Sequence, residues 1–381
     1  MRVDKTKWTK TILSEITHIT MGQSPDSSSY NKDAIGLPFY QGNADFGPIH
    51  PTPRIYCDAP TRTANEHELL ISVRAPIGAI NITNELCCIG RGLAAIQMID
   101  GKSYLHFIKY ILKAANEELN RQGTGMTFKA ISKKVLFNLT ICLPTFDIQQ
   151  TIASELDAIQ TMIDGYKAQL ADLDALAQSI FLDMFGDPVT NPKGWNKHIL
   201  NEICDVRDGT HDSPKYIDNG IPLITSKNIV DGKIDFSDTK NISISDADAI
   251  NKRSKVDNGD IIMPMIGAIG NPIIVESVRP FCIKNVALIK FNNANVINIY
   301  IKYLLSSSSF DEYMHKINKG VAQKFISLTV IRNFNIPLPP FSLQQQFAHR
   351  VEAIEKQKEL IKSQLADAET LMAERMQYYF S

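Results

Sequence analysis

Leu143-Pro144-Thr145-Phe146 opens a stretch whose apolar residues fall at steps of three and four, and the same arrangement returns at Leu338-Pro339-Pro340-Phe341. Inside the two stretches, Gln169-Leu170-Ala171-Asp172 recurs letter for letter as Gln364-Leu365-Ala366-Asp367. The interval between positions 143 and 338 is about 195 residues, far longer than a solenoid unit. It indicates that a whole domain has been duplicated together with an appended helix.

The duplication extends toward the N-terminus of each copy. The matching pairs are Trp8 with Trp195, Leu13 with Leu200, Glu15-Ile16 with Glu202-Ile203, Gly36-Leu37-Pro38 with Gly220-Ile221-Pro222, and Ile108-Lys109-Tyr110 with Ile301-Lys302-Tyr303. We therefore divide the chain into four parts. These are a globular domain over 1–145, a long helix over 146–187, a second globular domain over 188–340 and a second long helix over 341–381.

The globular parts carry mixed secondary-structure signals. Short runs rich in β-branched residues at 69–73, 261–266 and 286–291 predict strands, whereas 104–115 and 297–305 have helical periodicity. Turn residues separate these runs. The predicted class is α+β, as a tandem duplication of a globular domain followed by a long helix.

The two appended stretches have heptad seams. The first consists of Ile148, Ile152, Leu156, Ile159, Ile163, Tyr166, Leu170, Leu173, Ala177, Ile180 and Met184, and the second of Leu343, Phe347, Val351, Ile354, Ile361, Leu365, Ala368, Met372 and Tyr379. Lys358 and Arg375 interrupt the second seam and are expected at its edge. A helix of this length with one apolar stripe needs a partner. We predict that the two helices form an antiparallel coiled coil with a globular domain at each end; the alternative is that each helix packs on its own domain.

The helix ends are marked at equivalent places. Asp147 and Ser342 are N-cap candidates, because Gln150 and Gln345 follow them at the capping-box spacing. Gly186 is suited to the left-handed C-cap that would end the first helix.

Composition excludes several classes of protein. No apolar stretch is long enough for a signal peptide or a membrane span, which favours a soluble cytoplasmic protein. The 6 cysteines show neither metal-ligand nor disulfide-framework spacing. The formal net charge of -1 means that any nucleic-acid contact must be local.

The second globular domain carries a recognisable motif. Asp208-Gly209-Thr210-His211-Asp212-Ser213-Pro214-Lys215-Tyr216, followed by Thr225-Ser226-Lys227-Asn228, resembles the second target-recognition domain of type I restriction-modification specificity subunits. Phe185-Gly186-Asp187-Pro188 is similar to the end of that family's central helical region. The resemblance covers essentially the whole chain.

The resemblance implies a DNA-reading subunit that is not an enzyme. Each domain would read one half of a bipartite target, and the helices would set the spacing. DNA methyltransferase subunits would dock on the helices, two per chain, and a restriction endonuclease and translocase subunit would join through them. No cofactor is expected in this chain; S-adenosylmethionine, ATP and Mg would serve the partner subunits. The first domain departs from the motif at Met21-Gly22-Gln23-Ser24-Pro25, which suggests a different half-site.

Candidate DNA contacts are polar or basic side chains in loops, which can reach phosphates or base edges. In the second domain they are Thr210, His211, Ser213, Lys215, Tyr216, Thr225, Ser226, Lys227, Asn228, Gln323 and Lys324. In the first they are Gln23, Gln41, Asn43, Arg74 and Lys129, with Arg91 a weaker candidate. Each segment could instead be an ordinary turn held by its own hydrogen bonds.

Catalytic motifs of related enzymes are absent from the sequence. Asn271-Pro272-Ile273 and Asp187-Pro188-Val189 both fail the base-holding motif of a methyltransferase at its third position. We predict no catalytic residue and no metal ligand. Two other readings stay open, namely a coiled-coil adaptor without DNA contact and an enzyme with an unrecognised site.

Overall fold

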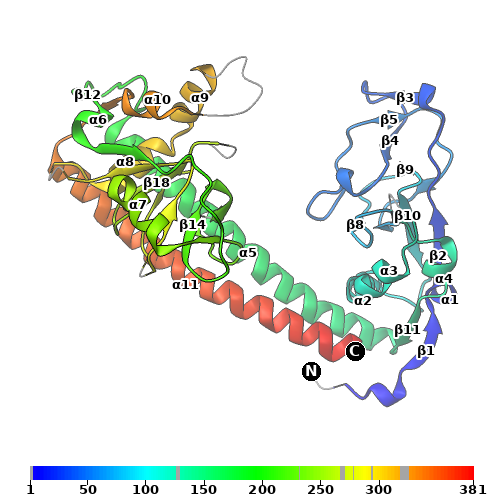
Figure 1. Cartoon of the computed structure of the whole chain (residues 1–381). Coiled ribbons are helices and arrows are strands. Elements are labelled where there is room, and N and C mark those ends of the chain that lie inside the picture. The colour runs from blue at the N-terminus through cyan, green and yellow to red at the C-terminus, as the bar shows by residue number, and fades with distance from the viewer. Residues whose placement is uncertain are drawn as a thin grey trace. The chain divides into compact units, whose positions relative to one another are not determined.

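The chain folds as two compact units in the computed structural model, which describes residues 3–125, 129–230, 232–266, 271–277, 279–292, 295–317 and 326–381. Unit 1 comprises Met1–Lys167 with Ser363–Ser381, and unit 2 comprises Ala168–Lys362. Each unit holds one globular domain and part of both long helices, α5 (Phe146–Phe185) and α11 (Phe341–Phe380) (Figure 1). The predicted α+β class and duplicated architecture are confirmed.

The domain of unit 1 contains small sheets and short helices. Its elements are η1 (Lys5–Lys7), β1 (Thr9–Ile12), α1 (Leu13–Ile16), β2 (Thr17–Met21), η2 (Ser27–Ser29), β3 (Tyr30–Asn31), β4 (Leu37–Tyr40), η3 (Asn43–Asp45), β5 (Tyr56–Cys57), β6 (Thr63–Ala64), β7 (Leu69–Ser72), β8 (Ile80–Ile82), β9 (Cys87–Ile89), β10 (Leu93–Met98), α2 (Leu105–Ala114), α3 (Asn116–Gln122), α4 (Lys133–Phe137) and β11 (Thr140–Leu143). The sheets have the strand orders β2-β10-β7-β8, β3-β5-β4-β9-β6 and β1-β11.

The domain of unit 2 repeats this plan. Its elements are β12 (Lys197–Ile199), α6 (Leu200–Ile203), β13 (Asp205–Asp208), β14 (Ile221–Ile224), η4 (Ser226–Asn228), β15 (Ile229–Val230), β16 (Lys233–Ile234), β17 (Lys240–Ile242), α7 (Ile244–Ser254), β18 (Ile261–Pro264), β19 (Ile273–Ile274), β20 (Cys282–Ile283), β21 (Val286–Lys290), α8 (Asn298–Leu305), α9 (Ser308–Ile317), α10 (Leu328–Arg332) and β22 (Asn335–Pro337). The order β13-β21-β18-β19 matches β2-β10-β7-β8, and β12-β22 matches β1-β11.

One feature of the sheets positions the loops of interest. In each domain a parallel pair joins two strands that are distant in sequence: β4 pairs with β9 in unit 1, and β14 with β20 in unit 2. Parallel neighbours end at the same edge of a sheet, so the loops that follow them lie together. The other strand pairs in the two units are antiparallel among the strands described.

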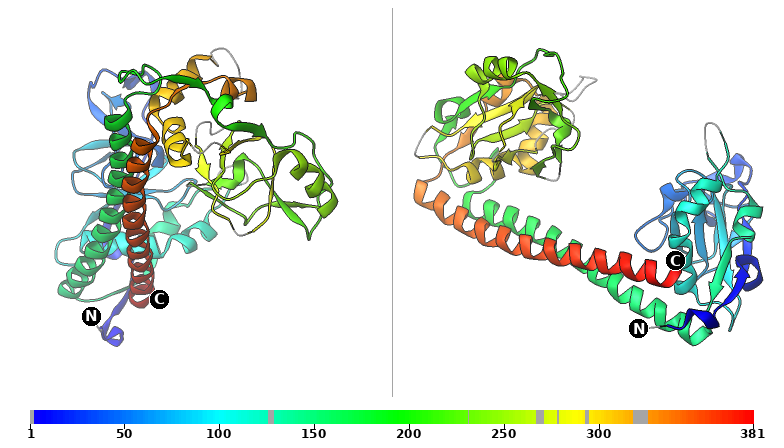
Figure 2. Two further views of the ribbon diagram at one scale, coloured as in Figure 1. Left: turned by 90° about the vertical axis from the view of Figure 1, so that its left-hand side faces the viewer. Right: turned by 60° about the horizontal axis from the view of Figure 1, so that its bottom comes forward.

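The long helices run antiparallel within each unit, and the views of Figure 2 show them side by side. In unit 1, Glu155 of α5 lies 3.0 Å from Arg375, and Lys167 lies 3.0 Å from Glu369. In unit 2, Asp174 lies 2.6 Å from Lys358. Residue numbers rise along α5 while those of the partners on α11 fall. The predicted pairing of the two helices is therefore confirmed, and the alternative in which each helix packs only on its own domain is wrong.

The two charges that interrupt the second seam form ion pairs across the helices. Lys358 is 13% exposed, and its amine lies 2.6 Å from Asp174 and 2.9 Å from Glu355. These two carboxylates raise the pKa of Lys358 despite its partial burial. Arg375 pairs with Glu155 in unit 1. The expectation that these side chains lie at the seam edge omitted their partners: Asp174 and Glu155 lie on α5, and Glu355 lies on α11 itself.

The predicted N-caps, Asp147 and Ser342, are wrong by two residues. Asp147 lies in the first turn of α5, which begins at Phe146, and α11 likewise begins at Phe341. The glutamines that act at these helix starts are Gln149 and Gln344, both buried, whereas the predicted Gln150 and Gln345 are exposed.

Each buried glutamine joins its long helix to the domain beside it. The Gln149 amide donates to the carbonyls of Lys102 and Pro144 and accepts from the backbone N–H of Tyr104 at 2.9 Å. Gln344 makes the equivalent bonds in unit 2, accepting from the backbone N–H of Ile297 at 3.0 Å. At the other end of α5, Gly186 has φ +77°, as expected for a left-handed C-cap.

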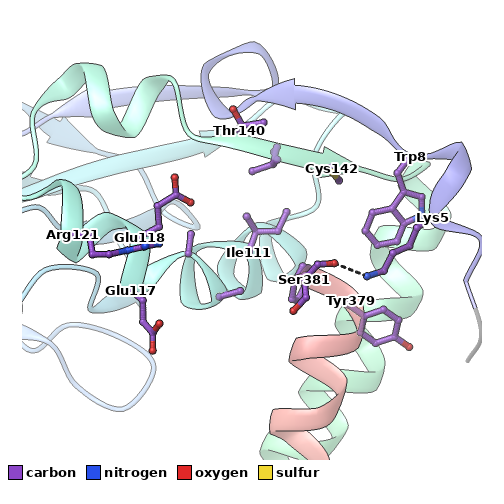
Figure 3. Close-up of a pocket in the computed structure, with 14 residues that line it drawn as sticks. Lys5, Trp8, Ile111, Glu117, Glu118, Arg121, Thr140, Cys142, Tyr379 and Ser381 are labelled. Carbon is purple, nitrogen blue, oxygen red and sulfur yellow. Dashed lines mark hydrogen bonds between the residues drawn. The ribbon is translucent and has the colours of Figure 1, made fainter.

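The ends of the long helices are held differently in the two units. In unit 2, the indole N–H of Trp195 donates to the Phe185 carbonyl at the end of α5, at 2.9 Å. In unit 1, the equivalent Trp8 indole N–H has no partner among the described residues. Instead Lys5 donates to the Ser381 carbonyl at 3.0 Å, beside a pocket of about 390 Å³ that Trp8 and Tyr379 help to line (Figure 3). Among the described residues, no helix combines the length and apolar character needed to cross a membrane.

Candidate nucleic-acid interface

Three loops of unit 2 meet at the ends of β13, β14 and β20. The backbone N–H of Thr210 donates to the Ile283 carbonyl at 3.0 Å, and that of Lys284 donates to the Ile224 carbonyl at 2.8 Å. Asn285 N–H then donates to the Thr210 carbonyl at 3.2 Å. The predicted segments around Thr210 and Thr225 are thereby brought together. The third loop, with Lys284 and Asn285, was not among the sequence candidates.

His211 lies in a network at the centre of these loops. Its Nε2 is 2.7 Å from the buried Asp208 carboxylate, and its Nδ1 is 2.8 Å from the Asn285 side-chain oxygen. Both partners are acceptors, so the ring satisfies them only when both nitrogens carry hydrogen. Arg253 pairs with the other oxygen of Asp208. The bond from Asn285, and then that from Asp208, raise the pKa of His211.

The raised pKa of His211 predicts a pH-dependent stability. The hydrogen bonds of protonated His211 stabilise the folded chain fully at pH values below the pKa of the ring in the unfolded chain, about 6.5. This stabilisation is lost as the pH rises through the higher pKa of the ring in the folded chain. Asn285 has φ +54°, so Asn285→Gly removes its amide without backbone strain. We expect this variant to lower the pKa of His211, followed by NMR titration of the ring. It should destabilise unit 2 more at pH 6 than at pH 9. Equal pKa values in the two proteins would contradict the network.

Asn228 has a structural role in its loop. The side chain is buried; its oxygen accepts from the backbone N–H and the hydroxyl of Thr225 at 3.0 and 2.9 Å. Its amide donates to the carbonyls of Asp235 and Asp238. Both polar groups are thus committed to holding the loop in shape. The side chain therefore positions the loop that carries Ser226 and Lys227, and a DNA contact by Asn228 itself stays a prediction.

Replacing Asn228 by alanine is expected to destabilise unit 2 by about 1–3 kcal/mol, because buried partners lose their hydrogen bonds. For a unit of this size the melting temperature should fall by about 2–12 °C. Calorimetry of the full chain checks this value. The matched control is Lys227→Ala in the same helical turn; Lys227 is exposed and should tolerate the change within about 0.5 kcal/mol. Equal melting temperatures for the two variants would show that Asn228 does not hold the loop.

Unit 1 builds the same backbone frame. The N–H of Gln23 donates to the Ile89 carbonyl at 3.0 Å, and the N–H of Gly90 donates to the Tyr40 carbonyl at 2.8 Å. These bonds match the two that place Thr210 and Lys284 in unit 2. Gln23 and Gln41 therefore begin adjacent loops, and both side chains are exposed.

Two further candidates of unit 1 lie together beside that frame. The N–H of Val73 donates to the Gly92 carbonyl at 2.9 Å, and the N–H of Ala75 donates to the Lys129 carbonyl at 2.9 Å. Arg74 lies between these two contacts, and its side chain and that of Lys129 are exposed. The loops of Gln23, Gln41, Arg74 and Lys129 are thus linked by backbone hydrogen bonds to one another or to the turn at residues 90–92, and we call this set of loops the unit 1 loop face.

The remaining candidates have varied positions. Lys215, Tyr216 and Lys227 are exposed, Ser226 and Asn43 are half-buried, and the exposed Ser213 accepts a hydrogen bond from Lys284. Gln323 and Lys324 lie outside the described residues. The structure brings Ser213 and Lys284 into the same cluster as His211.

The counterpart of Asn228 in unit 1 is Asp45, which sequence comparison missed. Its carboxylate accepts from the backbone N–H of Gln41 at 2.7 Å and pairs with Arg54. Asp45 is the last residue of η3 and Asn228 is the last residue of η4; each of these short 3-10 helices follows a strand of the parallel pair. The loop before η3 is one residue longer than the loop before η4, so Asp45 and Asn228 do not align when the two copies of the sequence are compared. The shared signal is an acid or amide that caps the turn.

Within the described ranges, no group of three or more histidine, cysteine and acidic side chains is arranged to hold a metal ion. The loops of both units carry exposed cations, Arg74 and Lys129 in unit 1 and Lys215 and Lys227 in unit 2, together with polar side chains. Such groups suit phosphates and base edges.

Comparison with known proteins assigns the chain to a family. The family model of the type I restriction modification DNA specificity domain matches residues 5–174 and 192–370. The chain belongs to this family and carries its domain twice.

Individual relatives are similar to different extents. The putative type I restriction enzyme MjaX specificity subunit of Methanocaldococcus jannaschii is 45% identical over 162 residues, which are 42% of this chain and 38% of that protein. The EcoBI specificity subunit of Escherichia coli is 24% identical over 95% of this chain and 82% of that protein. The crystal structure of a type I restriction-modification S subunit from M. genitalium has a TM-score of 0.60 at 14% identity, covering 100% of this chain and 98% of that one. The last comparison shows the shared fold.

Proposed function

We propose that this chain reads DNA for a type I restriction-modification complex, with unit 1 and unit 2 each contacting one half of a bipartite target. The observation that carries the proposal is a loop frame built twice with different side chains. Gln23 in unit 1 and Thr210 in unit 2 occupy the same place in that frame. A common frame with different polar side chains is suited to reading two different half-sites.

The charge distribution is compatible with local DNA contact. The formal net charge is -1, so attraction to phosphates must come from particular surfaces. Exposed cations occur on both sets of loops, Arg74 and Lys129 in unit 1 and Lys215 and Lys227 in unit 2. These lysines and arginines would neutralise phosphates beside the bases that are read.

We further propose that α5 and α11 bind DNA methyltransferase subunits, two per chain, through which a restriction endonuclease and translocase subunit joins. In support, Leu176 of α5 is 47% exposed and Leu360 of α11 is 62% exposed. A groove of about 410 Å³ lies between the helices in unit 2, lined by Leu173, Leu360 and Ile361 among others. Exposed apolar surface of this kind is typical of protein contacts. S-adenosylmethionine, ATP and Mg would bind to those partner subunits, and this chain would supply no catalytic group.

Mapping methylated bases in a host that expresses this chain with its methyltransferase tests the proposal. We expect a bipartite motif, and the complex should shift duplex DNA that contains this motif. The logarithm of the binding constant should fall with the logarithm of the salt concentration by about 0.9 per phosphate contacted. If the chain were an adaptor without DNA contact, replacing it by another family member would not change the methylated motif. Methyl transfer by the chain alone would instead establish an enzyme.

A further inference from the structure

The turn at residues 90–92 lies at the centre of the unit 1 loop face. It follows β9, and its backbone touches three other loops: Gly90 N–H donates to Tyr40, Val73 N–H donates to Gly92, and Arg91 N–H donates to the Ser24 hydroxyl at 3.4 Å. Arg74 and Lys129 lie at one side of this centre. The backbone that carries residue 91 is therefore bordered by three other loops of the face.

The turn is rigid because two glycines pack it against the backbone of Gln41. A Cβ on Gly92 would lie 2.2 Å from the Gln41 carbonyl oxygen, and one on Gly90 would lie 3.2 Å from the Gln41 Cα. The N–H of Leu93 donates to the Gly90 carbonyl at 3.0 Å and closes the turn. A larger residue at position 92 would displace the Gln41 backbone, and one at position 90 would be in tight contact with it. The chain thus fixes the starting point of the Arg91 side chain before any ligand binds.

The guanidinium of Arg91 is uncommitted. Among the described residues the side chain is exposed and forms no hydrogen bond or ion pair, whereas nearby Arg54 is held by Asp45. In unit 2 the same place is taken by Lys284 and Asn285, whose side chains bind Ser213 and His211. Of the two units, unit 1 therefore has a guanidinium without a hydrogen-bond partner among the described residues at this position, the turn at residues 90–92.

We propose that Arg91 determines specificity in the first half-site by donating two hydrogen bonds to a guanine in the major groove. The inference rests on the proposed DNA-reading function. A guanidinium on a rigid, central turn presents paired donors that match guanine O6 and N7. A cation at the edge of the unit 1 loop face would instead contact the phosphates of the DNA backbone.

The test uses the full chain assembled with its methyltransferase, carrying Arg91→Gln or Arg91→Lys. Binding is measured on duplexes in which each base pair of the first half-site is changed in turn. The wild-type complex should discriminate against replacement of one guanine by about 5- to 150-fold. Both variants should lose that discrimination while the preferences in the second half-site stay unchanged. Lysine keeps the charge but not the fork, so it should not rescue.

Arg121→Gln is the matched control, because Arg121 is exposed on α3 and lines the pocket beside the end of α11 (Figure 3). It should bind every duplex as the wild type does. A phosphate contact by Arg91 would overturn the proposal: Arg91→Gln would weaken all duplexes equally and reduce the salt slope by about 1, and Arg91→Lys would restore binding. If the wild-type complex methylated no bipartite motif, the proposed function itself would be wrong. If it methylated a bipartite motif but the Arg91 variants discriminated between bases as the wild type does, only the role of Arg91 would be wrong.

Discussion

Replacing Phe347 by alanine is expected to lower the stability of unit 2 by about 3–5 kcal/mol. Phe347 of α11 is fully buried, and its ring centroid lies 5.6 Å from that of Phe181, 5.3 Å from Phe185 and 5.2 Å from Tyr303. The cluster therefore joins both long helices to the helix α8 of the domain. Alanine would leave a cavity where these aromatic contacts were.

For a unit of this size the melting temperature should fall by about 6–20 °C. Calorimetry of the full chain measures it, with the unit 2 transition identified by hydrogen exchange. The control is Leu360→Ala on the same helix, since Leu360 is 62% exposed and its loss should cost less than about 0.5 kcal/mol. A loss below about 1 kcal/mol for Phe347→Ala would mean that the helices and domain do not share this core.

The second large effect concerns the helices as a ruler for the DNA target. Inserting seven residues after Leu173 in α5 and seven after Lys362 in α11 keeps the ion pairs of both units and the heptad seam. Each insertion adds about 10 Å of helix, which corresponds to about three base pairs. Both half-sites should stay the same, and the spacer between them should lengthen by about one to three base pairs.

Insertions of two residues at the same positions serve as the comparison. They rotate the seam by about 200° and should abolish assembly with the methyltransferase. Methylation mapping of the two variants measures both outcomes. An active heptad variant with an unchanged spacer would show that the helices hold the domains without setting the distance.

The duplication, the helix pairing and the buried residues of the helix seams could be predicted from the sequence, because they appear in it as local or repeated patterns. Ile159 and Ile163 were assigned to the seam and are buried in unit 1, as is Phe347 in unit 2. Phe181 and Phe185, which are also buried, were not assigned to it. Both contact Tyr300 of the domain as well as Phe347 of α11, and a heptad pattern describes only the contacts between the helices.

The loop clusters could be predicted only in part. Their assembly depends on the parallel pairs of β4 with β9 and of β14 with β20, which join strands far apart in sequence. No local pattern identifies such a pairing, so Lys284 and Asn285 were missed. Asn228 was assigned to the loop, but its buried hydrogen bonds were not identified, because the same residue type serves in a turn and at a base edge. Only the burial of the side chain separates these roles.

Exchange of residues 1–145 for the equivalent domain of another family member tests the central claim most directly. The hybrid chain is expressed with the original methyltransferase, and methylated bases are mapped across the host DNA. The first half of the bipartite target should change to the donor's half, while the second half should remain because the loops of unit 2 around Thr210 and His211 are untouched. A target that changed in both halves, or in neither, would contradict the assignment of one half-site to each unit.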